Sequence, residues 1–166
     1  MWAAIISEFA DSPSQSRVAR FLLENGFGVN HNGRIECNGI EVSATKVAKA
    51  IGTDRRVVDA TARHILKSPS LREIFANIRV TPDLSFLAGR LGLSVITIIP
   101  KDARQKGIVG AAVEIVTTHN LNIRQIFVTD PMLSEEPRLV IIIDGSLPGA
   151  VIEEIKSLPQ VKRVIL

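Results

Sequence analysis

Apolar residues in the first part of the chain recur mostly at helical spacing. Over residues 14–24 they return every three or four positions, which predicts a helix. Between residues 27 and 42, short β-branched pieces are separated by Asn32-Gly33 and Asn38-Gly39, dipeptides that favour tight hairpin turns. The pattern therefore predicts one helix followed by a small element of two or three strands.

A second helical stretch follows this element directly. Ser43 is a suitable N-cap residue, and the apolar pattern after it predicts a helix that ends at Gly52. Thr53 or Asp54 then caps a further helix that runs through Leu66. The expected unit is a helix, a glycine turn and a second helix.

Two shorter segments complete the first part of the chain. Residues 71–78 are expected to form a short helix or strand. Thr81-Pro82-Asp83 is expected to begin a helix through Leu91, because proline is favoured in the first turn of a helix. Gly92 ends this helix, and we place the domain boundary there, so that the first domain comprises residues 1–92.

Beyond the boundary, residues 93–166 alternate between strand and helix patterns in the order βαββαβ. The strands are expected at Val95–Ile99, Ile123–Thr129, Leu139–Ile143 and Val161–Leu166, and the helices at Gly107–His119 and Pro148–Leu158. This order predicts a sheet with both helices on one face, the ferredoxin-like arrangement. The predicted fold class is therefore α+β, with a helical first domain and a ferredoxin-like second domain.

Composition limits what kind of protein this is. The 166 residues are 46% hydrophobic and 22% charged, which is typical of a globular chain. No apolar run approaches the roughly 18 residues that a membrane span needs, so we expect a cytoplasmic protein with no membrane contact. Cys37 is the single cysteine, which excludes an intrachain disulfide and an all-thiolate metal site. We expect no metal and no other cofactor.

Charge is distributed unevenly along the chain. Residues 1–92 contain 12 Lys and Arg against 9 Asp and Glu, whereas residues 93–166 contain 8 of each. Within residues 43–72 the local balance is +5. Such a cluster predicts a surface that faces phosphates, and the alternative is a solvated helical face.

A helix-turn-helix needs a small residue where its helices cross, a glycine in its turn and an apolar residue in its second helix. Ala48, Gly52 and Val58 have these spacings. Residues 44–62 therefore resemble helix-turn-helix DNA-binding domains, and the preceding hairpin resembles the β element of winged-helix domains. The resemblance implies contacts with double-stranded DNA from Thr53, Arg55, Arg56, Asp59 and Arg63.

Arginine suits this position because its planar guanidinium group binds guanine edges or phosphates. Asp54 and Asp59 oppose the interpretation, because phosphates repel carboxylates. The alternative is a three-helix unit that serves dimerisation or protein contact.

The second domain contains two further motif points. Gly107 stands at a helix start after the first strand, and Asn122-Ile123 opens the second strand. On these points the domain resembles the ACT domain, a small-molecule sensor of amino-acid metabolism, although Lys106 replaces the proline common in that family. The resemblance implies an amino-acid effector at the helix N-terminus, across a dimer interface from Asn122 of the other chain. The implied ligand-binding residues are Asp102, Ala103, Arg104, Lys106, Gly107, Ile108, Val109, Asn122 and Ile123.

Other functions for a βαββαβ domain lack the residues they need. An RNA-recognition module stacks bases on aromatic side chains, and neither expected central strand contains one. His31, His64 and His119 are scattered, and no phosphate loop or nucleophile elbow occurs. We therefore predict that the protein is not an enzyme, although carboxylates that only folding brings together leave no sequence signal.

Together the two halves resemble archaeal proteins described as predicted regulators of amino-acid metabolism. The expected function is a ligand-responsive transcriptional regulator whose partners are duplex DNA, a small amino-acid effector and a second copy of the chain. We expect a homodimer or a higher homo-oligomer, because edge strands as apolar as Ile123–Thr129 and Val161–Leu166 are seldom left open to water. The alternative is a regulatory or scaffolding subunit that dimerises through its ACT domain and docks on a metabolic enzyme.

Overall fold

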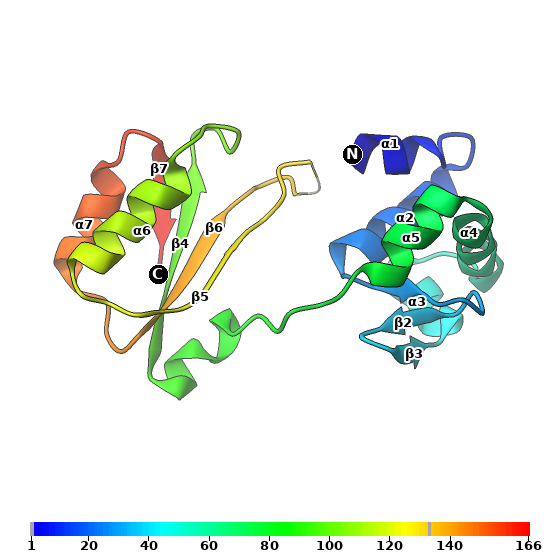
Figure 1. Cartoon of the computed structure of the whole chain (residues 1–166), viewed down its shortest axis with the longest axis horizontal. Coiled ribbons are helices and arrows are strands. Elements are labelled where there is room, and N and C mark those ends of the chain that lie inside the picture. Colours follow the sequence, from blue (N-terminus) through cyan, green and yellow to red (C-terminus); the bar gives the residue numbers. More distant parts are fainter. Residues whose placement is uncertain (1, 133) are drawn as a thin grey trace. The chain divides into compact units, whose positions relative to one another are not determined.

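The computed structural model describes residues 2–132 and 134–166. The chain is a mixed α and β protein with two antiparallel sheets, and it divides into two compact units between Thr81 and Pro82 (Figure 1). The division therefore comes before the predicted boundary at Gly92. The segment after Pro82 belongs to the second unit because η1 packs against the sheet and because the Gln125 Oε1 accepts a hydrogen bond from the Leu84 N–H at 3.1 Å while its Nε2 donates to the Pro82 carbonyl at 2.7 Å. These bonds attach the segment after Pro82 to the second unit.

The first unit combines helices with a small sheet of strand order β1-β2-β3, in which β1 contacts α4 and α5. Its elements are α1 (Trp2–Ser7), α2 (Pro13–Glu24), β1 (Gly28–Val29), β2 (Ile35–Cys37), β3 (Ile40–Val42), α3 (Ala44–Ile51), α4 (Arg55–Lys67) and α5 (Pro69–Asn77). The predicted helices and the three-stranded form of the hairpin are confirmed. Residues 71–78, left open between helix and strand, lie mostly in α5, and α1 was not predicted.

The core of the first unit forms where α4 packs against α2, α3 and α5. Val58 and Ile65 of α4 are fully buried, as is Thr61, whose hydroxyl donates to the Val57 carbonyl at 2.8 Å. Asn38 joins the hairpin to the end of the unit, because its amide both donates to and accepts from the Val80 backbone at 3.0 Å. The face of α4 opposite this core is exposed to solvent.

The second unit contains one four-stranded sheet with the order β5-β6-β4-β7, in which all neighbours are antiparallel. Its elements are η1 (Ser85–Leu91), β4 (Leu93–Pro100), α6 (Ile108–Thr118), β5 (Ile123–Val128), β6 (Leu139–Asp144), α7 (Gly149–Ser157) and β7 (Val161–Ile165). The predicted order βαββαβ is confirmed, and the two strands predicted to be edges, β5 and β7, are the outer strands of the sheet.

The predicted helix from Thr81 to Leu91 is wrong in type and in start. The segment is a 3-10 helix that begins at Ser85. Gln125 engages the backbone of Pro82 and Leu84, and the Asp83 carboxylate accepts the Ser85 N–H at 2.8 Å. These tertiary and local bonds occupy groups that a regular helix starting at Thr81 would use.

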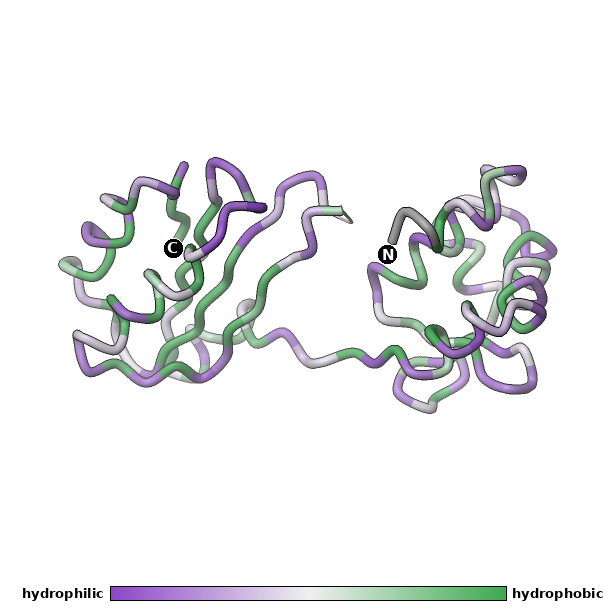
Figure 2. Tube along the Cα trace, turned by 45° about the horizontal axis from the view of Figure 1, so that its top comes forward, coloured by the Kyte–Doolittle hydropathy of each residue, from purple (hydrophilic) through white to green (hydrophobic). Residues whose placement is uncertain are grey.

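Two layers of side chains cover the sheet. Figure 1 shows α6 and α7 on one face, where Ala112 and Ile155 pack against strand residues such as Ile96 and Ile141. On the other face, Ala88 of η1 packs against strand residues that include Val140. Figure 2 shows hydrophobic residues over most of the sheet, and Leu139–Ile143 of β6 is buried throughout.

Candidate functional site

The turn between α3 and α4 has the geometry that its three spacing residues predict. Gly52 has φ 64° and ends α3 in the left-handed region. Ala48 and Val58 are both buried where the two helices contact each other. A residue with a side chain would be strained at Gly52, so the glycine fixes the direction in which α4 leaves the turn.

Asp54 caps α4. Its Oδ1 accepts a hydrogen bond from the Arg56 N–H at 2.7 Å, which satisfies one of the backbone donors that every helix start leaves free. The sequence predicted Thr53 or Asp54 as the cap, and the structure assigns the role to Asp54. In the structure it has a local structural role.

Asp59 and Arg55 form an ion pair on the surface of α4, with 3.2 Å between the Asp59 Oδ2 and the Arg55 Nε. The pair partly neutralises the second carboxylate of this helix. The same pair occupies the charge of Arg55. Thr53, which precedes the helix, is half-buried. Of the five residues expected to contact DNA, Arg56 and Arg63 therefore remain exposed and uncompensated.

Arg56, Arg63 and Lys67 form what we call the basic face of α4. Their spacing of seven and four residues places them along one side of the helix, and all three are exposed. Within residues 2–132 and 134–166, none of them has an ion-pair partner. Positive charge at these positions is therefore available to an external anion.

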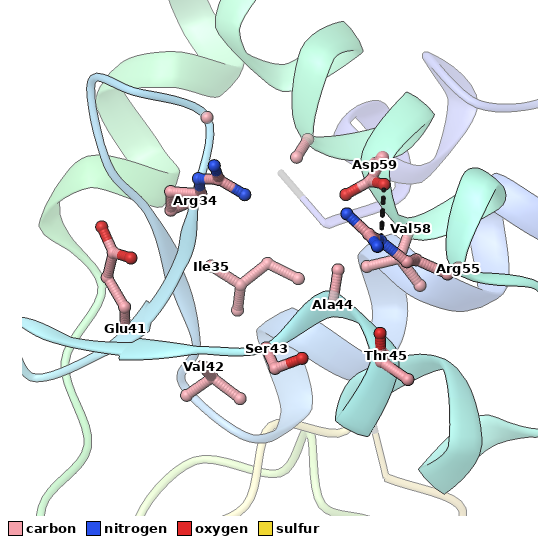
Figure 3. Close-up of a pocket in the computed structure, with 12 residues that line it drawn as sticks. Arg34, Ile35, Glu41, Val42, Ser43, Ala44, Thr45, Arg55, Val58 and Asp59 are labelled. Carbon is pink, nitrogen blue, oxygen red and sulfur yellow. Dashed lines mark hydrogen bonds and ion pairs between the residues drawn. The ribbon is translucent and has the colours of Figure 1, made fainter.

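A pocket of about 370 Å³ lies between the β2–β3 hairpin and the starts of α3 and α4. Figure 3 shows Arg34 and Arg55 extending into it from opposite sides, with Asp59 paired to Arg55. Glu41 also lines the pocket, and its Oε1 accepts a 3.3 Å hydrogen bond from the Asn30 side chain. Sequence reasoning did not include Arg34 among the residues expected to contact DNA. No local pattern connects it to α4, because the hairpin fold alone brings the two together.

The start of α6 is the second candidate site. Gly107 has φ 90° and precedes the helix without any side-chain cap, and a Cβ built on it would meet no atom within 4 Å. An apolar pocket of about 140 Å³ lies beside it, lined by residues that include Ile108, Val109, Val128 and Leu139. The backbone at this helix start is accessible to a small ligand.

The loop before Gly107 is mostly exposed, including Asp102, Arg104 and Lys106, whereas Ala103 is half-buried. The Asp102 Oδ1 accepts the Arg104 N–H at 2.9 Å, and the Asp102 carbonyl accepts the Gln105 N–H at 3.2 Å. The carboxylate of Asp102, one of the implied ligand-binding residues, is therefore already part of a local turn.

The structure does not bring Asn122 to this loop. Gly107 precedes α6 and Asn122 follows it, and the eleven residues of α6 separate them by about 16 Å. Asn122 is exposed, its backbone carbonyl accepts the Asp144 N–H at 3.0 Å, and Ile123 is half-buried against the helix-covered core. A site that includes both the loop and Asn122 needs two chains.

The histidines have local partners or face solvent. The His64 ring packs against Phe9 with 4.7 Å between centroids, the His119 Nε2 lies 2.7 Å from the Glu154 Oε1, and His31 is exposed. In the part of the chain that the structure describes, no group of three or more His, Cys, Asp or Glu residues could hold a metal ion. No described helix has the length and apolar composition needed to cross a membrane.

Comparison with known proteins gives little further information. No protein-family model and no curated protein sequence matches the chain. One solved structure, titled "Crystal structure of PH0061", aligns with 93% of this chain and 88% of its own at 12% identity and a TM-score of 0.30. A likeness at this level supports no inference about fold or function.

Proposed function

We propose that the chain is a ligand-responsive transcriptional regulator of amino-acid metabolism, with a helix-turn-helix in its first unit and an ACT-like sensor in its second. The observation that carries the proposal is the basic face of α4, which directly follows the Gly52 turn. The first unit also holds the whole excess of positive charge, because residues 1–81 contain 11 Lys and Arg against 8 Asp and Glu, whereas residues 82–166 contain 9 of each.

In this proposal α4 is the helix that enters the major groove of DNA. Arg56 in its first turn is positioned to contact base edges, and Arg63 and Lys67 extend along the same side toward phosphates. The two carboxylates that oppose DNA binding both have partners within the helix, since Asp54 caps it and Asp59 pairs with Arg55. Arg34, across the pocket from Arg55, adds a further positive charge next to this helix (Figure 3).

The second unit is proposed to bind the effector. Its element order and its strand order β5-β6-β4-β7 are those of a ferredoxin-like sheet, on which ACT domains are built. An amino acid would place its carboxylate at the open helix start beside Gly107 and its side chain in the adjacent apolar pocket, with Asn122 supplied by a second chain. A ligand that favours one arrangement of the two chains then changes the spacing of the two α4 helices against DNA half-sites.

The test compares duplex DNA binding by the wild type, Arg56→Ala, Arg63→Ala and a control, Arg20→Ala. Arg20 is an exposed arginine of α2 in the same unit, paired with Glu24, so the control removes the same charge away from α4. Where a variant removes a phosphate contact, we expect the slope of the logarithm of the DNA-binding constant against the logarithm of salt concentration to fall in magnitude by about one. Where it removes a base contact, we expect the binding free energy to weaken by about 1–3 kcal/mol. The control should bind as the wild type does.

Equal losses in all three variants would mean that net charge, and not the face of α4, carries binding. No salt-dependent affinity in the wild type would refute the DNA half of the proposal and favour the enzyme-docking subunit.

A further inference from the structure

The side of the second sheet that faces away from α6 and α7 is only partly covered. Ala88 of η1 packs against it, yet a groove of about 490 Å³ remains beside η1. The groove is lined mainly by apolar side chains from the strands and the C-terminal residues. These include Val95, Phe127, Val140, Ile165 and Leu166. We call this groove, together with η1, the open sheet face.

Phe86 of η1 stands at the rim of this groove and is 92% exposed. Its exposure means that the ring does not fill the groove of its own chain. Ile165 and Leu166, which also line the groove, are exposed as well, and so are Leu87 and Leu91 of η1. Exposed apolar side chains gathered at one groove mark a surface that binds another molecule.

We propose that the open sheet face binds the same face of a second copy of the chain, so that Phe86 of each chain occupies the groove of the other. A two-fold interface requires one surface patch to be complementary to itself. The open sheet face meets this requirement, because it carries a projecting aromatic ring and an apolar groove side by side. Aromatic residues that insert into pockets are the usual anchors of such interfaces.

The charges at the groove support a second copy as the occupant. Asp83 and Arg138 both line the groove, and neither has an ion-pair partner among the described residues. A purely acidic or purely basic partner would leave one of them facing a like charge. A second copy whose two-fold axis passes between these two residues presents each charge with its opposite, and the contact is then made twice.

This interface and the proposed effector site lie on different sides of the sheet and share one lining residue, Arg138, which borders both the groove and the pocket beside Gly107. The effector site uses the helix start at Gly107 and needs Asn122 of a second chain, whereas the open sheet face lies on the side of the sheet away from α6. The inference does not rest on the proposed function, because Phe86 and Asp83 line only the groove, so that Phe86→Glu and the rescue by Asp83→Arg test the interface without altering the effector pocket.

The first experiment measures the mass of the full-length chain by light scattering at micromolar to tens of micromolar concentrations. We expect the wild-type particle to contain at least two chains. We expect the Phe86→Glu particle to have half the wild-type mass when any interface at the effector site is unchanged. Ile40→Glu is the matched control, because Ile40 of β3 is 73% exposed in the first unit, and this variant should keep the wild-type mass. A monomeric wild type, or an unchanged mass for Phe86→Glu, would overturn the proposal.

The second experiment uses the charges. Arg138→Asp alone should reduce the mass, and adding Asp83→Arg should restore it, because the pair is then reversed and again complementary. Amide exchange of the wild type at two concentrations needs no variant, and we expect η1 and β5 to become more protected as concentration rises. Exchange in these elements that does not depend on concentration would show that the face stays open and would overturn the proposal. A loss of oligomer only in Gly107 or Asn122 variants would assign the interface to the effector site instead.

Discussion

The cap of α4 is the most direct link between stability and the proposed DNA surface. Asp54→Ala removes the side-chain acceptor that holds the Arg56 N–H at 2.7 Å, and Asp54→Asn keeps an acceptor but removes the negative charge. Both variants change one exposed residue and leave the buried core of the unit as it is. Their comparison separates the hydrogen bond from the charge.

The two contributions have different sizes. Replacing an N-cap aspartate by alanine costs about 1 kcal/mol, within a range of about 0.5–2, whereas asparagine caps about as well as aspartate. A negative charge at a helix start contributes a further 0.3–1 kcal/mol or so through the helix dipole. We therefore expect Asp54→Asn to lower the free energy of unfolding by about 0.3–1 kcal/mol and Asp54→Ala by about 1–2 kcal/mol. In a unit of this size, 1 kcal/mol corresponds to a melting-temperature shift of about 4–8 °C.

Native-state amide exchange of the Arg55–Lys67 segment measures this loss within the first unit alone. Asp59→Ala is the control, because the exposed pair of Asp59 with Arg55 is worth at most about 0.5 kcal/mol. The same Asp54→Asn variant should bind duplex DNA more tightly than the wild type, since a carboxylate is removed from the proposed DNA surface. Wild-type exchange in both Asp54 variants would refute the capping role, and unchanged DNA affinity in Asp54→Asn would place the duplex away from the start of α4.

Two further predictions concern glycines. Gly28→Ala would place a Cβ 2.6 Å from the Phe75 carbonyl oxygen, and we expect calorimetry to show that overpacking lowers the free energy of unfolding by about 1–3 kcal/mol. In the control Gly89→Ala, the new Cβ meets nothing within 4 Å, so the free energy of unfolding should change by less than about 0.5 kcal/mol. Equal stability of the two variants would contradict the close approach of β1 to α5. Gly107→Val and Asn122→Ala should each weaken binding of the amino acid that most raises the melting temperature, as measured by calorimetry with the oligomer mass as a control. Wild-type affinity in both variants, with the mass intact, would place the effector site elsewhere.

Local signals were sufficient to predict most elements of this chain. Asn38 and Gly39 both have positive φ in the hairpin turn that their dipeptide predicts, and Gly52 ends α3 in the left-handed conformation. The cap of α4 was predicted to be Thr53 or Asp54 from their place before an apolar periodic run, and it is Asp54. In each case, the backbone preference of one or two residues determines the outcome, so no tertiary information was needed.

The features that sequence reasoning missed depend on contacts between distant residues. The helix predicted from Thr81 became a 3-10 helix because Gln125, far along the chain, binds the backbone of Pro82 and Leu84. Arg34 reaches the pocket beside α4 only through the hairpin fold. Phe86 lay in a segment predicted as a helix through Leu91, and its exposure follows from how η1 lies on the sheet. No local pattern contains these contacts.

The measurement that tests the proposed function most directly is the effect of amino acids on DNA affinity. Duplexes recovered by repeated selection from a random-sequence pool are titrated with the full-length chain, with and without an equimolar mixture of the twenty amino acids. Coupling between two sites typically changes affinity by about 5–150-fold, and a ligand-responsive regulator should show a change within that range. Failure to recover any duplex, or the same affinity with and without the amino acids, would contradict the proposed function.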